Sequence, residues 1–151
     1  IMRVLIQRVS QADVLVKKKI ISKIGNGLLV FVAFCDEDNL SDISWSIRKI
    51  INLRIFADNL QKMNYSLVDQ NGDILIVSQF TLFASVKKGN RPSWNGAASS
   101  EKGKELYDCF IENLNKFYTP DKVFTGLFGA DMKVKLKNDG PVTIFFDSKI
   151  K

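Results

Sequence analysis

The first part of the chain alternates between short apolar runs and polar turns. Branched apolar residues fill residues 2–9, 12–16 and 20–24, and polar residues separate each run from the next. This composition is typical of β-strands. A Gly-Asn-Gly turn at residues 25–27 precedes residues 28–34, a continuous apolar run that is typical of a strand buried on both faces. The chain is therefore predicted to open with a β-rich segment.

Two later segments have the apolar spacing of amphipathic helices. In residues 40–51 the apolar side chains recur every three or four positions, directly after capping residues at 38–41. The second segment can be capped by Ser99 or Ser100 and is stopped by the Thr-Pro pair at 119–120. Its inner face is formed by Leu106, Phe110, Leu114 and Phe117. The pattern predicts two main helices.

The remaining apolar runs predict further strands, with Asn71-Gly72 as a hairpin turn and residues 138–141 as a turn between two paired strands. About ten strands around two helices indicate an α+β domain. We expect a single domain over residues 1–151, with an antiparallel or mixed sheet curled into a barrel-like core. The runs that carry this expectation are residues 52–56, 65–68, 74–83, 123–126, 132–137 and 142–147.

Composition supports a packed core and a soluble protein. Hydrophobic residues make up 46% of the 151 residues, which is ample for one buried core. No apolar run has the eighteen or so residues that a membrane span needs, and no leader pattern is visible. We therefore expect a cytoplasmic protein with no membrane contact. Ile1 precedes Met2, and Met2 is expected to be the natural start.

The chain contains no histidine and only two cysteines. Zinc sites, Ser-His-Asp triads and Cys-His dyads therefore lack an obligatory member, and no metal site is expected. Cys35 and Cys109 lie in apolar contexts, which favours buried thiols over a disulfide or a nucleophile. If the protein is an enzyme, its proton transfers must use groups other than imidazole or a paired thiol.

A net charge of +6 favours an anionic partner, and the cations are clustered. Lys17–Lys19 is expected to be the polar tip of a hairpin, whereas a second cluster lies on a loop. In the third cluster every second residue is basic, so a strand would carry three cations on one face. That face could bind phosphates or could simply be solvated. The second and third clusters are Lys87, Lys88 and Arg91, and Lys133, Lys135 and Lys137.

Four segments carry candidate chemistry, and each also has a purely structural explanation. The polar residues in 78–82 could form the floor of a pocket, or a buried polar network. Arg91 and Trp94 on the loop 87–100 could bind phosphate and stack on a base, or the Trp could only anchor the loop. The glycines of 126–132 allow close approach of a ligand or a bend. Gly140-Pro141 could be an ordinary turn or a cis bond that presents its carbonyl groups.

Together these segments resemble one family, the D-aminoacyl-tRNA deacylases, also called D-tyrosyl-tRNA deacylases. The resemblance covers almost the whole chain and depends on five motifs in the family's order and spacing. These are MRVLIQRVSQADV at the start, SQFTL at 78–82, GNRPS at 89–93, TGLFGADM at 125–132 and NDGPVT at 138–143.

The resemblance implies a homodimeric hydrolase that needs no metal or cofactor. Its substrate would be the ester between a D-amino acid, or glycine, and the 3′-terminal adenosine of tRNA. A cis Gly140-Pro141 pair would reach into the partner subunit's pocket, hold the substrate amino group with its carbonyl oxygens and exclude L side chains. Arg8 would fix the orientation of this pair through its rigid donor fork.

The resemblance also assigns the remaining site residues. Ser78, Gln79, Phe80 and Thr81 would be catalytic, with either Thr81 as nucleophile or the 2′-hydroxyl of the tRNA assisted by main-chain N–H groups of residues 79–81. The second mechanism is favoured, because a threonine without a general base is a poor nucleophile. The adenosine would be lined by Gly129, Ala130 and Met132. The acceptor stem would be held by Lys87, Lys88 and Arg91, with Lys133, Lys135 and Lys137 as further candidates. The rival hypothesis is a β-rich RNA-binding module without catalysis.

Overall fold

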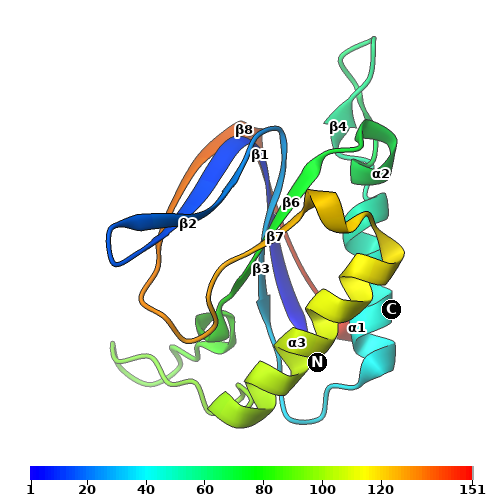
Figure 1. Cartoon of the computed structure of the whole chain (residues 1–151). Coiled ribbons are helices and arrows are strands. Elements are labelled where there is room, and N and C mark those ends of the chain that lie inside the picture. The colour runs from blue at the N-terminus through cyan, green and yellow to red at the C-terminus, as the bar shows by residue number, and fades with distance from the viewer. Residues whose placement is uncertain (151) are drawn as a thin grey trace.

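The computed structural model describes residues 1–150 and contains a mixed six-stranded sheet covered by two long helices (Figure 1). The strand order is β2-β1-β3-β6-β7, and β8 pairs with the other side of β1. Pairing is antiparallel except between β3 and β6 and between β6 and β7, which confirms the mixed sheet. The strands are β1 (Arg3–Val16), β2 (Lys19–Ile24), β3 (Gly27–Ala33), β6 (Asp73–Ser78), β7 (Val123–Thr125) and β8 (Lys133–Asp147).

The sheet curls into a nearly closed, barrel-like form, as predicted. The first half of β1 pairs with β3 and its second half with β2, while β8 follows β1 along most of its length. The hydroxyl group of Ser22 on β2 donates a hydrogen bond to the carbonyl of Thr125 on β7. These two strands end the strand order, so this bond brings the two margins of the sheet together.

Both predicted helices are present and lie side by side on one face of the sheet (Figure 1). Helix α1 (Leu40–Asn52) begins after Asn39, whose side-chain oxygen accepts hydrogen bonds from the amides of Ser41 and Asp42 at 2.9 and 3.2 Å. Helix α3 (Ser100–Phe117) begins after Ser99, whose hydroxyl accepts from the amide of Lys102. Local capping therefore fixes where each helix starts.

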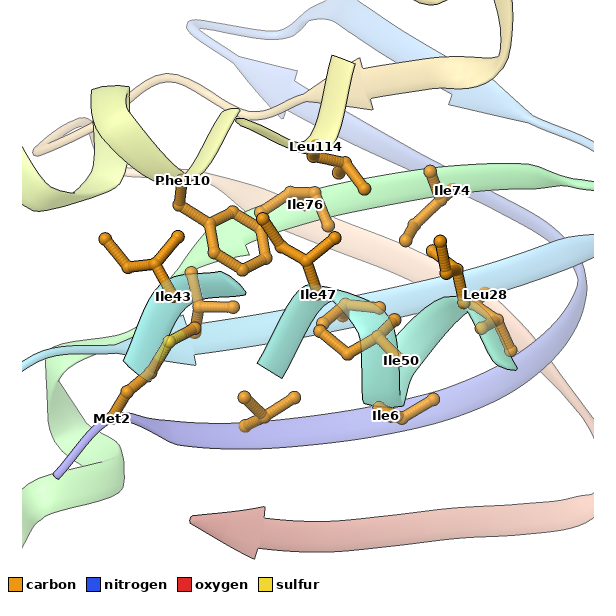
Figure 2. Close-up of a cluster of buried hydrophobic side chains, with 14 of the residues drawn as sticks. Met2, Ile6, Leu28, Ile43, Ile47, Ile50, Ile74, Ile76, Phe110 and Leu114 are labelled. Carbon is orange, nitrogen blue, oxygen red and sulfur yellow. The ribbon is translucent and has the colours of Figure 1, made fainter. Parts of the chain in front are cut away.

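The main core lies between these helices and the face of the sheet that they cover (Figure 2). Side chains of α1 and α3 interdigitate there with those of β1, β3 and β6. Burial of this apolar surface is the main source of stability, and it also fixes the carboxyl ends of β3 and β6. The fully buried residues of this core include Ile6, Leu28, Ile43, Ile47, Ile50, Ile74, Ile76, Phe110 and Leu114.

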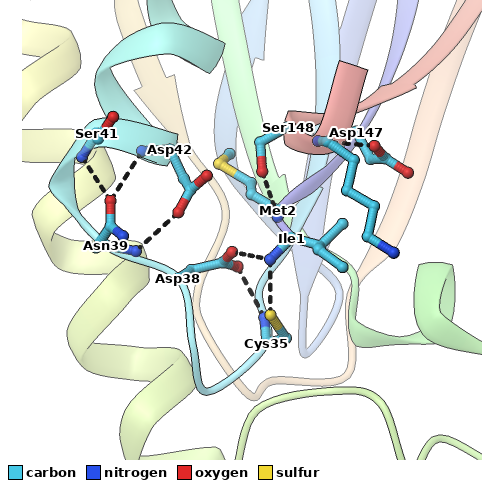
Figure 3. A network of polar contacts seen from close by, with 10 residues as sticks. Ile1, Met2, Cys35, Asp38, Asn39, Ser41, Asp42, Asp147 and Ser148 are labelled. Atoms are coloured by element: carbon cyan, nitrogen blue, oxygen red, sulfur yellow. Dashed lines mark hydrogen bonds and ion pairs between the residues drawn. The ribbon is translucent and has the colours of Figure 1, made fainter. Parts of the chain in front are cut away.

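A polar network ties the start of β1 to the loop before α1 and to the last turn of the chain (Figure 3). The amide of Met2 donates to the hydroxyl of Ser148 at 3.0 Å. The buried carboxylate of Asp38 accepts from the amide of Cys35 at 2.8 Å and from the amino group of Ile1. Burial raises the pKa of the Cys35 thiol, which keeps it protonated. Both cysteines are free thiols; Cys35 is buried, as predicted, whereas Cys109 is only partly buried.

None of the helices in residues 1–150 is both long enough and apolar enough to cross a membrane.

Two of the predicted strand boundaries were wrong because adjacent runs merge. Residues 2–9 and 12–16 form the single strand β1, and residues 132–137 and 142–147 form the single strand β8. Residues 138–141 are therefore not a hairpin turn, since the segments before and after them both pair with β1. The side-chain amide of Asn138 donates to the carbonyls of Arg8 and Val142 at 3.0 and 3.1 Å. These bonds hold the irregular stretch against β1.

The region between α1 and β6 also differs from the prediction. Strands β4 (Phe56–Ala57) and β5 (Met63–Tyr65) form a small hairpin, and a short helix, α2 (Leu67–Gln70), replaces the expected strand at 65–68. Ser66 and Asp69 cap this helix reciprocally. Asn71, at φ 50°, ends it in the left-handed conformation. Asn-Gly marks a helix end here because the same residues that favour hairpin turns also favour helix C-termini.

Candidate active site

A cavity of about 490 Å³ opens at the carboxyl ends of the parallel strands β3 and β6. Ligands in mixed and parallel sheets commonly bind at this edge. The cavity brings together two segments predicted to act, one from 78–80 and one from 129–132. The predicted residues on its wall are Ser78, Gln79, Phe80, Gly129, Ala130 and Met132.

The segment SQFTL is not the continuous strand that the apolar run predicted. Strand β6 ends at Ser78, and residues 80–83 form a short 3-10 turn, η1 (Phe80–Phe83). The main-chain amide of Gln79 donates to the carbonyl of Val32 at 2.8 Å, so this donor is occupied, contrary to expectation. The amides of Phe80 and Thr81 begin the turn, where amides have no carbonyl partner within the helix. Within SQFTL, they are the main-chain donors left for a ligand.

Thr81 lies beside the cavity wall rather than on it. The side-chain amide of Gln79 donates to the Thr81 hydroxyl oxygen at 2.6 Å. A carboxamide nitrogen has no lone pair available to accept a proton, so Gln79 cannot act as the general base for this hydroxyl. The contact positions the two side chains but does not activate Thr81.

The segment 126–132, whose residues 128–132 form one wall of the cavity, is anchored at β6. The amide of Gly126 and the buried hydroxyl of Tyr107 both donate to the carbonyl of Ile76, at 2.9 and 3.1 Å. The Tyr107 ring also packs against Phe128, with ring centroids 5.6 Å apart. Burial raises the pKa of Tyr107 far above its ordinary value, so this group is a structural donor.

Sequence reasoning missed several residues of the cavity wall. Ser99 and Ser100 were identified only as helix caps, yet the start of α3 points them at the cavity. Phe128 and Asp131 complete the wall at 128–132, and Asp131 also forms an ion pair with Lys133 at 3.1 Å. Their only signal was proximity in sequence to predicted residues. Within residues 1–150, no group of three or more His, Cys, Asp or Glu side chains is arranged to hold a metal ion.

The Gly140–Pro141 peptide bond is cis, and both residues are exposed on β8, away from the cavity wall. Arg8 holds the backbone immediately before them. Its Nε donates to the carbonyl of Asp139 at 3.0 Å and its Nη1 donates to the carbonyl of Ile55 at 2.6 Å. One chain therefore does not bring Gly140 and Pro141 to the residues of SQFTL, but it does fix their orientation.

The basic loop, residues 85–93, projects away from the sheet (Figure 1). Two hydrogen bonds between the main chains of Ser85 and Ser93, at 2.7 and 3.0 Å, close it. The predicted phosphate-binding side chains Lys87, Lys88 and Arg91 are exposed on this loop and are not part of the cavity wall. The predicted lysines of β8, Lys133, Lys135 and Lys137, are also exposed, and Asp131 forms an ion pair with Lys133.

Two solved structures have the same fold as this chain and define its structural class. One is titled as a c-Myc DNA unwinding element binding protein and is 41% identical, with a TM-score of 0.92 over 96% of this chain and 97% of that one. The other is titled as a probable eukaryotic D-amino acid tRNA deacylase, with 22% identity and a TM-score of 0.83 over 97% and 98% of the two chains. Both share this barrel-like α+β fold.

Sequence comparison then gives the family. The model of a family described as D-Tyr-tRNA(Tyr) deacylase matches residues 5–147. D-aminoacyl-tRNA deacylases of Thermosipho melanesiensis and Flavobacterium psychrophilum are each 55% identical, over 98% and 99% of both chains respectively. The chain belongs to the D-aminoacyl-tRNA deacylase family. It is a hydrolase with aminoacyl-tRNA as its substrate, so the hypothesis of a non-catalytic RNA-binding module is not retained.

Arg3 is a positioning residue that sequence reasoning did not identify. Its Nη1 donates to the carbonyl of Leu82 at 2.8 Å, and its guanidinium lies 4.6 Å from the centroid of the Phe83 ring. The amide of Leu82 in turn donates to the carbonyl of Gln79 at 3.1 Å. Arg3 therefore links β1 to the end of η1, the turn that presents the amides of Phe80 and Thr81.

We expect Arg3→Met to lower kcat about ten-fold with little change in KM, because a shifted turn misplaces donors that act in the transition state. Arg3→Lys, which keeps the charge but not the planar fork, should have an intermediate effect. The matched control is Arg54→Met, since Arg54 donates to the carbonyl of Asn64 at 2.9 Å on the remote β4–β5 hairpin. Steady-state kinetics with thermal melts would check this, and an equal loss in both variants would contradict it.

Proposed function

We propose that this chain removes D-amino acids and glycine from tRNA and rejects L-aminoacyl-tRNA through Gly140 and Pro141 of a second copy of the chain. The observation that carries the proposal is the position of this pair. It is exposed and Arg8 fixes the backbone directly before it, yet it lies away from its own cavity. A group built this rigidly on the surface is suited to another molecule's site.

A symmetric dimer would let each chain complete the other's cavity. Strand β8 is suited to such a contact because it borders the sheet and pairs only with β1 among the described strands. Phe145 and Leu136, on this strand, are 51% and 38% exposed, which is apolar surface that a second copy could cover. The homodimer is thus part of the proposal, because Gly140 and Pro141, the proposed gate, can act only on the cavity of a second copy.

The proposed gate selects by shape and by main-chain acceptors. Carbonyl oxygens of Gly140 and Pro141 would accept hydrogen bonds from the substrate ammonium group. With the ester carbonyl held in the cavity, two of the four directions around the α-carbon would then be fixed. A D side chain would then point out of the cavity, whereas an L side chain would collide with the gate. Glycine has no side chain and would pass, so glycyl-tRNA is expected to be a substrate as well.

We further propose that the amides of Phe80 and Thr81 stabilise the oxyanion that forms when water attacks the ester carbonyl. The 2′-hydroxyl of the terminal ribose assists this attack, and the 3′-oxygen leaves with a proton to give free amino acid and tRNA. Support comes from the Thr81 hydroxyl, which accepts a hydrogen bond from Gln79 and has no histidine to activate it. Gly129, Ala130 and Met132 would line the adenosine, and Lys87, Lys88 and Arg91 would contact acceptor-stem phosphates.

Thr81→Ala is expected to lower single-turnover hydrolysis of D-tyrosyl-tRNA by less than about ten-fold. The variant removes a hydroxyl group that orients Gln79 but leaves the main-chain amide of residue 81 in place. Rapid-quench measurement of the cleavage rate, together with substrate affinity, checks this. An inactive variant that binds substrate normally would instead identify Thr81 as the nucleophile.

The proposed function is tested by comparing D-tyrosyl-, L-tyrosyl- and glycyl-tRNA hydrolysis with a chelator present. We expect cleavage of the D-tyrosyl and glycyl esters and none of the L-tyrosyl ester. Equal cleavage of the D-tyrosyl and L-tyrosyl esters would contradict the proposed gate. Loss of activity in chelator would show that a metal is required after all.

A further inference from the structure

Two exposed aromatic rings lie at the mouth of the cavity. Phe80 and Trp94 pack edge to face with ring centroids 5.4 Å apart and an interplanar angle of 83°. Phe80 is part of the cavity wall, and yet 56% of it is exposed; Trp94 is 40% exposed. Aromatic side chains of this size are normally buried, and a pair left open beside a cavity is typical of a binding surface.

The main chain holds Trp94 in place from both sides. The paired residues Ser85 and Ser93 close the loop directly before it, and the amide of Ala97 donates to the Trp94 carbonyl at 2.9 Å. The ring is therefore presented by an ordered turn. This arrangement reduces the entropy that a ligand would lose on stacking against it.

The same loop carries the charges that a nucleic-acid strand needs. Lys87, Lys88 and Arg91 are exposed, and none of them forms an ion pair with another side chain in the described part of the chain. Single-stranded nucleic acid is commonly bound by aromatic side chains that stack on bases beside cations that attract the phosphates. Both components occur here within one short segment.

We propose that Phe80 and Trp94 form a stacking subsite for the unpaired base that precedes the terminal adenosine of the tRNA. The inference rests on the proposed function, because it takes the adenosine to occupy the cavity. The preceding nucleotide must then leave through the cavity mouth, where the two rings lie. Its phosphate groups continue toward the loop with Lys87, Lys88 and Arg91.

With this subsite, the enzyme would cleave aminoacyl-RNA more efficiently than a free aminoacyl nucleoside, which has no preceding base. Stacking of one base on an aromatic side chain contributes about 1 to 3 kcal/mol, which corresponds to a gain of about five- to 150-fold in kcat/KM if it persists in the transition state. Stacking makes no hydrogen bonds to the edge of the base and therefore depends little on base identity. This suits an enzyme that acts on many tRNAs.

The test compares three small substrates that differ only before the adenosine. They are D-tyrosyl-adenosine, the D-tyrosyl ester of the dinucleotide CpA, and the same dinucleotide with an abasic residue in place of cytidine. We expect the wild-type chain to cleave the CpA ester with a kcat/KM about ten-fold above the other two. Trp94→Leu should remove this advantage and leave D-tyrosyl-adenosine cleavage unchanged, while Trp94→Phe should retain most of it.

Val86→Ala is the matched control, because Val86 is 70% exposed on the same loop and is not part of the aromatic pair. It should keep the full advantage of the CpA ester, and thermal melts should show all three variants folded. If Trp94→Leu lowers cleavage of all three substrates equally, Trp94 only supports the loop and the subsite is wrong. A wild-type chain that cleaves the three substrates at equal rates also overturns the subsite, whereas one that cleaves none overturns the proposed function instead.

Discussion

Replacing Gly140 with alanine is expected to lower kcat/KM for D-tyrosyl-tRNA about 100-fold and to weaken discrimination against L-tyrosyl-tRNA. Gly140 has φ +135°, where an L residue is strained. An added Cβ would lie 2.8 Å from Nη2 of Arg8, the residue that fixes this segment. Either the arginine or the carbonyl groups of the gate must then move, and misplacement of about 1 Å has an effect of this size. Initial rates with both enantiomers measure it.

The control for backbone strain is Gly89→Ala. Gly89 also has a positive φ, +63°, but nothing lies within 4 Å of an added Cβ. This variant should keep the ratio of D to L cleavage even if its loop is slightly destabilised. A Gly140→Ala protein with the wild-type rate and ratio would show that the pair does not act as the gate.

Gly27→Ala is expected to destabilise the fold by about 3 kcal/mol or more. Gly27 is paired with Asp73 where the parallel strands β3 and β6 begin. An added Cβ would lie 1.9 Å from the carbonyl oxygen of Asp73, which is backbone and cannot rotate away. The first part of this pairing must therefore open. Denaturant unfolding followed by circular dichroism gives the change in free energy of unfolding.

Gly25→Ala, two residues earlier in the same turn, is the matched control. Nothing lies within 4 Å of a Cβ at that position. We expect its free energy of unfolding to stay within about 1 kcal/mol of wild type, because it changes mainly the entropy of the unfolded chain. Equal stability of the two variants would mean that the strands separate at this point without cost.

Local signals in the sequence were sufficient for the two long helices, α1 and α3, and for the outline of the sheet. Asn39 and Ser99 marked the starts of α1 and α3, because a capping side chain acts within a few residues. The course of β8 could not be read in this way. Residues 138–141 contain turn residues, but β1 offers a pairing partner on both sides of them, and that partner lies more than 100 residues away in sequence.

The candidate site was predicted in its components but not in its arrangement. The motifs at 78–82 and 125–132 do converge on one cavity. The occupied amide of Gln79 depends on where β3 ends in space, and the contribution of Ser100 depends on where α3 begins; no local sequence pattern contains this information. The separation of Gly140 from the cavity likewise depends on the tertiary fold. Motif order alone cannot say whether two motifs meet within one chain.

Strand β1 carries two arginines with different tasks, five residues apart. Arg3 supports the turn that bears the Phe80 amide, and Arg8 supports Gly140. In the proposed dimer, the first task serves the chain's own cavity and the second serves its neighbour's. A small slide of this one strand would therefore change the speed of one reaction centre and the stereochemical accuracy of the other. Mixed dimers with a single altered strand would show these two defects in separate halves of the assembly.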